Sequence, residues 1–285
     1  MDREPLKDTF YTPGSKLKNP GSLAREMLAD LIAARGLAWR LFLRNLSSQY
    51  RQTVLGYVWL FLPPLATTIA WVFLNSQNIL NVGVTEVPYP VYVLSGTLLW
   101  QGFVDALNSP MQVVQESRAM LTKVNFPREA LILSGLGSVI FNFIIRMVLL
   151  AGLFLYYKIP LKLNMLFAPI GFVGLMLFGL TVGLLLLPLA TLYGDVQRGL
   201  QIITGFWFFL TPVVYTAPTS WPASLVSTLN PVSPLLLVAR QWLVGMEASN
   251  LYAFSSVMFI TLCLTLAGWL VFRLAMPMLI ERIGS

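Results

Sequence analysis

Histidine is absent from this 285-residue chain, and cysteine occurs once. No imidazole is therefore available for catalysis or metal binding, and Cys263 alone cannot form a disulfide or a thiolate cluster within one chain. Charge is also scarce, because Asp, Glu, Lys and Arg make up only 11% of the residues, against about 25% in an ordinary globular domain. The twelve acidic residues are spread thinly and form no paired-carboxylate motif. These absences argue against an enzyme and against a metal centre.

Apolar residues dominate instead, at 56% of the chain, and they recur in long runs that predict membrane-spanning helices. The net charge of +7 is assigned to loops near anionic lipid, and not to nucleic-acid binding. The sequence thus predicts an all-α polytopic membrane protein with six transmembrane helices. The predicted spans cover about residues 55–74, 91–114, 131–157, 165–192, 200–215 and 251–276.

The remaining segments divide the chain around this 55–276 transmembrane domain. Residues 1–21 contain three prolines and are predicted to form a mobile cytoplasmic tail, and residues 22–54 are predicted to form amphipathic helices. Residues 216–250 contain four prolines and apolar pieces too short to cross a bilayer, which predicts re-entrant external helices between spans five and six. Residues 277–285 form a short cytoplasmic tail.

The segment just before the first span is amphipathic at helical spacing, with basic side chains on one narrow stripe and apolar side chains on a wide arc away from it. This pattern predicts a helix in the membrane interface, with its basic groups toward the lipid headgroups and its aromatic rings in the acyl boundary. A soluble helix packed on a partner is the alternative. The residues assigned to the interface are Arg40, Arg44 and Arg51 on the basic stripe, and Trp39 and Phe42 on the apolar arc.

Loop charge predicts the orientation. Six spans place both termini on one side, and that side collects fifteen of the nineteen basic residues, whereas the other side has three. Because cytoplasmic loops carry the excess of Lys and Arg, both termini are predicted to be cytoplasmic.

Residues 116–129 form a charged island between the second and third spans, with three basic and two acidic residues in fourteen positions. A simple turn between spans needs no such charge, so we interpret the island as a cytoplasmic docking element. The short break at 193–198 is either a plain turn with an N-capping Asp195 or, given Arg198, a second docking contact. The chain has no Walker A motif, so any ATP that is used is bound by another polypeptide.

Polar residues also occur inside the predicted spans: Gln101, Asp105 and Asn108 in the second and Arg146 in the third. A charge at mid-bilayer costs roughly 2.5–3.5 kcal/mol on insertion scales, so such residues normally face a bundle interior or a wet cavity. They are therefore channel candidates that line a polar path or pair across it, unless they snorkel to a membrane face. Trp100 joins them as one of many aromatic residues, which either stack on sugars or form an interfacial belt.

Five segments resemble, in order, the membrane (permease) subunit of ABC-type polysaccharide exporters. They are RQTVLGYVW at 51–59 followed by Pro63-Pro64, PYP at 88–90 followed by LSG and Trp100, KVNFPRE at 123–129, YGDV at 193–196, and NPVSP at 230–234. Together they cover about residues 40–240. The family exports O-antigen, capsular polysaccharide or teichoic acid across the bacterial cytoplasmic (inner) membrane.

The resemblance implies a homodimer of this subunit with two ABC ATPase subunits, which bind the ATP and Mg²⁺ that this chain does not. It implies a coupling helix at the charged island and short gate helices in the 216–250 segment. The coupling residues expected from the island, with the second cytoplasmic break, are Lys123, Val124, Asn125, Phe126, Pro127, Arg128, Glu129, Asp195 and Arg198. The external-gate residues expected are Trp221, Asn230, Pro231 and Pro234.

The function expected is that of a channel-forming permease subunit for lipid-linked polysaccharide, most plausibly of O-antigen type. Three alternatives remain at this point: an ABC permease for a small lipid or drug, an intramembrane glycosyltransferase, and a proton-coupled carrier that uses Asp105 and Arg146. The absence of histidine and of clustered carboxylates argues against the glycosyltransferase.

Overall fold

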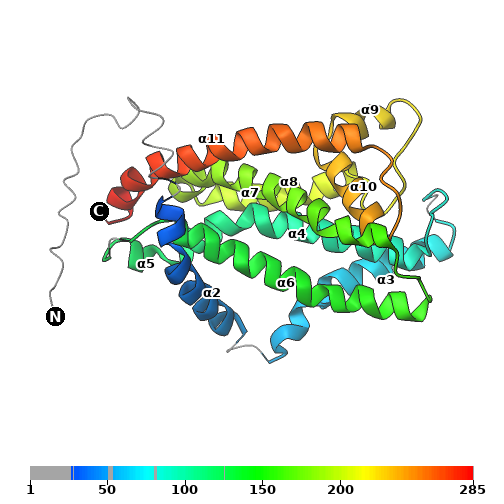
Figure 1. The fold of residues 1–285 in the computed structure, drawn as a ribbon, viewed down its shortest axis with the longest axis horizontal. Helices are drawn as coiled ribbons and strands as arrows, with labels where there is room; N and C mark the ends of the chain where they lie inside the picture. The colour runs from blue at the N-terminus through cyan, green and yellow to red at the C-terminus, as the bar shows by residue number, and fades with distance from the viewer. Residues whose placement is uncertain (1–26, 28, 51–53, 80–81, 125, 285) are drawn as a thin grey trace.

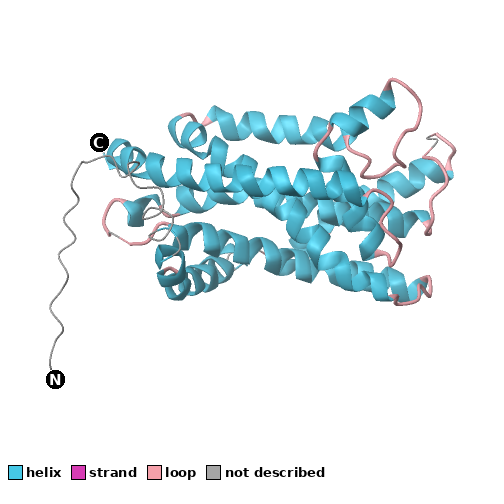
Figure 2. Cartoon of the chain, turned by 45° about the horizontal axis from the view of Figure 1, so that its top comes forward, coloured by secondary structure: helices cyan, strands magenta, loops and turns pink. Residues whose placement is uncertain are grey.

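The computed structural model describes residues 27, 29–50, 54–79, 82–124 and 126–284. The predicted tail 1–21 and the predicted contact residues Arg51 and Asn125 lie outside these ranges. Within them the regular elements are helices and no strand occurs (Figure 2), which confirms the predicted all-α class. The helices in chain order are α2 (Arg35–Tyr50), the 3-10 helix η2 (Gly56–Leu60), α3 (Leu62–Ser76), α4 (Tyr89–Glu116), α5 (Arg118–Leu121), α6 (Glu129–Tyr156), the 3-10 helix η3 (Leu163–Phe167), α7 (Ala168–Leu192), α8 (Asp195–Leu210), α9 (Ala223–Leu229), α10 (Val232–Leu243) and α11 (Leu251–Gly284).

The long helices run alongside one another as an elongated bundle with two distinct ends (Figure 1). One end carries α2, α5 and the C-terminal end of α11, and the opposite end carries α9 and α10. The segments predicted to be cytoplasmic therefore gather at one end, and the segment predicted to be external lies at the other.

Among the described residues, three helical segments are long and apolar enough to cross a membrane: Glu129–Tyr156, Leu163–Leu192 and Leu251–Arg282. They match the third, fourth and sixth predicted spans. Helix α4 is 28 residues long but carries the polar residues described above. Helices α3 and α8 have only 15 and 16 residues, about 24 Å at 1.5 Å per residue, against about 30 Å of hydrocarbon. That the chain crosses the membrane six times therefore remains a prediction.

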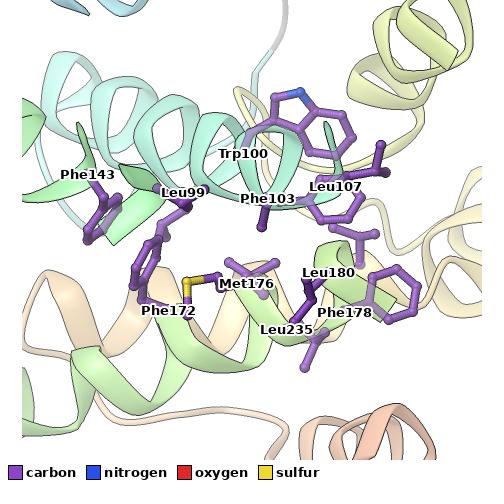
Figure 3. Packing of buried hydrophobic residues seen from close by; sticks show 14 of the residues in the cluster. Leu99, Trp100, Phe103, Leu107, Phe143, Phe172, Met176, Phe178, Leu180 and Leu235 are labelled. Carbon is purple, nitrogen blue, oxygen red and sulfur yellow. The ribbon is translucent and has the colours of Figure 1, made fainter. Parts of the chain in front are cut away.

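Helix α4 is the centre of the bundle. All ten residues from Val91 to Trp100 are buried, and α4 packs against α7, α6, α3 and α10. Figure 3 shows its side chains Phe103 and Leu107 meeting Met176 and Leu180 of α7. Because apolar contact alone gives helices little preference for one another over lipid, close backbone approach through small residues matters at such interfaces.

Glycines on α7 provide that close approach. A Cβ atom at Gly179 would lie 2.5 Å from the carbonyl oxygen of Phe103, and one at Gly183 would overlap the carbonyl oxygen of Leu107. A side chain at either position would thus collide with the backbone of α4, which cannot move aside as a flexible side chain can. The α4–α7 interface therefore requires glycine at both positions.

Helix α2 lies against α6, and this corrects one expectation. Phe42, predicted to face the acyl boundary, is instead buried and contacts Gly137 and the ring of Phe141, whose centroid is 6.0 Å away. The missing side chain at Gly137 leaves a notch on α6 that accepts the Phe42 ring. Trp39 is 61% exposed and Arg40 is exposed, so these two side chains remain available to an interface.

We predict that Gly179→Val destabilises the protein by about 1–3 kcal/mol, the usual cost of overpacking, because the added methyl groups meet α4 backbone. Gly152→Val in α6 is the matched control, since nothing lies within 4 Å of a Cβ there. Thermal unfolding of the two detergent-purified variants measures the difference. Equal melting temperatures would contradict the close α4–α7 contact.

Candidate functional site

The two predicted intramembrane charges form an ion pair between α4 and α6. Arg146 Nη1 donates to Asp105 Oδ2 at 2.6 Å, and Gln101 Nε2 donates to Asp105 Oδ1 at 3.0 Å. The Arg146 side chain is only 8% exposed, so it does not snorkel to a membrane face. Both carboxylate oxygens of Asp105 are thus engaged, and the carboxylate is held in a fixed position on α4.

A cleft of about 780 Å³ lies between α3, α4 and α8. We call it the aromatic–amide cleft, because rings and amide or hydroxyl groups alternate on its walls. The lining includes four of the channel candidates, Trp100, Gln101, Asp105 and Asn108, together with Thr67, Ala70, Trp71, Thr97, Val104, Gln112, Gln197, Gln201, Thr204, Gly205, Phe208 and Phe209. Such a lining suits a ligand with both C–H faces and hydroxyl groups, since rings cover the former and amides bond the latter.

The fifth channel candidate lies on the other side of α4. Arg146 lines a second cavity of about 530 Å³ between α2, α4 and α6, with Arg44 and Asn142. Asp105 and Asn108 line both cavities. Asp105 therefore lies on the wall that the two cavities share, and Arg146 binds it from the side of the second cavity.

At the end of the bundle that carries α9 and α10, Asn230 joins α8 to α10. Its amide nitrogen donates to Thr211 Oγ1 at 2.8 Å, and its amide oxygen accepts from Trp207 Nε1 at 3.0 Å. The same oxygen accepts the backbone N–H of Val232 at 3.1 Å, at the start of α10. Asn230 is thus a buried connector.

The other predicted gate residues differ in exposure and position. Pro231 is the N-cap of α10 and Pro234 lies in its first turn, a position that tolerates proline. Trp221 is 81% exposed and takes no part in the Asn230 hydrogen bonds. Two short helices, α9 and α10, therefore occupy the predicted external segment, one exposed and one largely buried.

Sequence reasoning missed Arg240, which entered it only as one of the three basic residues counted on the external side, with Lys158 and Lys162. Arg240 is 3% exposed, and its Nη1 donates to the carbonyl oxygens of Pro212 and Val213 at 3.1 and 3.0 Å. Its guanidinium carbon lies 3.7 Å from the centroid of the Tyr92 ring, in a cation–π contact. The signal in the sequence is an arginine inside the apolar 235–244 run, where a loop charge would not be placed.

Two tyrosines of α4 complete this arrangement. Tyr89 Oη donates to the carbonyl of Val214 at 3.0 Å, and Tyr92 Oη donates to the carbonyl of Tyr215 at 2.9 Å. The four consecutive carbonyls of residues 212–215, just after α8 ends, therefore all accept side-chain donors. Non-helical backbone is costly at membrane depth unless protein groups satisfy it, and these donors do so. We call Arg240, Tyr89 and Tyr92 the carbonyl clamp.

The charged island lies at the α5 end of the bundle, and most of its described residues are accessible. Lys123, Val124 and Pro127 are exposed, and Phe126 and Arg128 are half-buried. Asp195 and Arg198 are exposed at the start of α8, where Gly194 and not Asp195 is the N-cap. A small cavity is lined by both Arg118 and Gln197, so the two predicted docking segments are neighbours.

Glu129 was expected to contact the ATPase at the surface, but its side chain is buried. It is 5% exposed, and its Oε1 lies 3.5 Å from Nη1 of Arg273 on α11. Glu129 begins α6, and the apolar face of this helix turns its first residues toward the bundle, with Ala130 and Leu131 also buried. Its carboxylate is therefore tied within the chain.

These features define a polytopic helical membrane protein with a polar, ring-lined cleft, the class to which membrane permeases belong. The described residues contain no cluster of His, Cys, Asp or Glu that could hold a metal ion. No family model matches the chain.

The chain is nevertheless similar over most of its length to curated permeases. It is 28% identical to the O-antigen export system permease protein RfbA of Myxococcus xanthus over 217 residues, which cover 74% of this chain and 81% of the relative. It is 24% identical over 238 residues to a protein of the same name from Klebsiella pneumoniae, covering 81% and 88%. These relatives confirm the predicted resemblance to the permease subunit of ABC-type polysaccharide exporters.

We predict that Arg146→Met alone destabilises the protein by about 3 kcal/mol, because it leaves the Asp105 carboxylate without its charge partner. Asp105→Leu/Arg146→Met removes both charges and should cost clearly less than the sum of the single changes. Arg44→Met is the control for loss of an exposed arginine. Unfolding titrations in mixed micelles measure the cycle, and strict additivity would contradict the pairing.

We predict that Tyr92→Phe and Tyr89→Phe each lower stability by about 1 kcal/mol, because each leaves one partly buried carbonyl without its side-chain donor. Arg240→Met should cost more, since two carbonyls lose their donor. Tyr252→Phe is the matched control, because Tyr252 is 85% exposed. Thermal unfolding of the four variants provides the comparison, and no difference from the control would argue against the carbonyl clamp.

Proposed function

We propose that this chain is the channel-forming permease subunit of an ATP-driven exporter that moves lipid-linked polysaccharide of O-antigen type across the bacterial cytoplasmic (inner) membrane. The relatives named O-antigen export permeases support the class of substrate. The observation that carries the proposal within this chain is the aromatic–amide cleft, which offers both ring faces and hydrogen-bonding amides to a sugar chain.

The proposed topology has six spans with both termini in the cytoplasm. Helices α3, α4, α6, α7, α8 and α11 are the spans, and the end that carries α5 faces the cytoplasm. The clustering of α2, α5 and the C-terminal end of α11 at one end supports this orientation. Helices α9 and α10 are then the re-entrant external gate helices, with the exposed Trp221 beside α9.

A second copy of the chain is proposed to close the cleft into a channel. The cleft is bounded by α3 and α8, and both helices carry exposed apolar side chains. These include Ile69 and Phe73 on α3, and Ile202, Phe206 and Phe209 on α8. A glycan chain is too long for a closed pocket, so a continuous path between two copies fits the substrate better than an occluded site.

Two ABC ATPase subunits are proposed to supply ATP hydrolysis, because this chain has no Walker A motif. They would dock on the exposed part of the charged island, chiefly Lys123, Val124 and Pro127, and on Asp195 and Arg198 beside it. A loop held between rigid helices can pass on ATPase closure as a rigid-body shift of those helices.

Reconstitution tests the substrate and the energy source together. The chain is co-expressed with the proposed ABC ATPase subunit, inserted into liposomes, and supplied with lipid-linked O-antigen. ATP-dependent transfer of the glycan to the opposite face is the expected result. Export of a small lipid or drug without glycan transfer would favour the alternative permease function, and transport driven by a pH gradient without ATPase would favour a carrier.

For the docking surface, we predict that Lys123→Glu lowers both co-purification of the ATPase and glycan export at least tenfold, because charge complementarity to the partner is reversed. Lys162→Glu is the control, another exposed lysine on the loop before η3, at the proposed external side. Both variants are expected to remain folded by thermal unfolding. Normal ATPase binding by Lys123→Glu would rule out docking at this residue.

A further inference from the structure

Three charged residues from distant parts of the chain meet at the α5 end of the bundle. Arg273 of α11 lies 2.6 Å from Asp30 through Nη2 and 3.5 Å from Glu129 through Nη1. Asp30 belongs to the helical turns that precede α2, and Glu129 is the first residue of α6. One guanidinium therefore bridges two carboxylates that are about a hundred residues apart in sequence. We call these residues the Arg273 junction.

The surroundings hold the junction in place. The side chains of Arg273 and Glu129 are 19% and 7% exposed, whereas that of Asp30 is 43% exposed. Phe272 and Met276, on either side of Arg273 in α11, are fully buried and fix the rotation of that helix. A buried carboxylate is costly without a charge partner, so Glu129 depends on Arg273.

The junction links α6 and α11, two helices that do not pack along each other. Helix α11 packs chiefly along α7 and α10, whereas α6 packs along α4 and α2. The junction also touches the charged island. A cavity of about 270 Å³ beside it is lined by Phe126, Pro127 and Arg128 as well as by the three junction residues and Phe272. The end of the island therefore borders the same cavity as α11 and the N-terminal helical turns.

We propose that Arg273 is a positioning residue that makes the docking segment, the N-terminal helical turns and α11 move as one body when the ATPase pushes on the segment. This inference rests on the proposed docking function. A shift of Glu129 by more than about an ångström relative to α11 would separate a buried carboxylate from its charge partner, which is unfavourable. A displacement of the segment therefore reaches α6 through the backbone. It also reaches α11 through the contact between Glu129 and Arg273.

The sharpest test removes the link without leaving a buried unpaired charge. Glu129→Leu/Arg273→Met replaces both buried charges with apolar groups of similar size, which buried ion pairs often tolerate without loss of stability. The complex with the ATPase is reconstituted in liposomes, and ATP hydrolysis and glycan export are measured together. We expect normal assembly and ATP hydrolysis but at least a fivefold rise in ATP consumed per glycan exported. An unchanged ratio would overturn the proposal.

Arg273→Lys provides a second test, which does not require the double variant to fold. It keeps the positive charge but cannot bridge two carboxylates with a planar fork, so we expect an ATP-to-export ratio between those of the wild type and the double variant. A wild-type ratio in this variant would also contradict the positioning role. A purely structural role would lower the amount of folded complex and leave the ratio unchanged, which counts against the proposal.

The docking surface and the Arg273 junction can be tested separately. Should the Lys123→Glu variant bind the ATPase normally, the docking surface is wrong, whatever the junction does. Should Lys123→Glu lose the ATPase while the junction variants keep the wild-type ratio, docking stands and the positioning role of Arg273 is wrong.

Discussion

A polar group buried among apolar helices must find its partner inside the protein, and this constraint shapes the whole bundle. The few buried charges each tie together elements that are distant in sequence. Asp105 and Arg146 join α4 to α6, Arg240 joins α10 to α4 and to the backbone after α8, and Glu129 with Arg273 joins α6 to α11. Because apolar contact between helices is not selective in lipid, these few polar interactions contribute to the specificity of the packing.

At each end of the bundle, neighbouring segments are held to different degrees. At the α9–α10 end, α10 is buried and fixed by Arg240 and Asn230, whereas α9 has no buried residue and lies outside that network. At the α5 end, the island exposes Lys123 and Val124 while its last residue, Glu129, is anchored inside. Each end thus combines an exposed segment with a buried attachment to the core.

The sequence was sufficient for the class, for most helix positions and for four α4 residues of the cleft, Trp100, Gln101, Asp105 and Asn108, because apolar run length and the spacing of polar residues within one helix depend only on local order. It was insufficient wherever a side chain's role depends on a distant neighbour. Phe42 is buried because Gly137 leaves a notch, and Arg240 is buried because carbonyls after α8 need donors. Neither partner can be read from the residues next to them.

The carbonyl clamp has a consequence for the source of energy. In transporters driven by ion gradients, the carbonyls of an unwound helix commonly coordinate the driving cation. Here the carbonyls of residues 212–215 already accept hydrogen bonds from Arg240, Tyr89 and Tyr92, and the Arg240 guanidinium places a positive charge beside them. A sodium or potassium ion at the end of α8 would therefore meet the Arg240 guanidinium and carbonyls that already have donors, which disfavours a driving cation at this place.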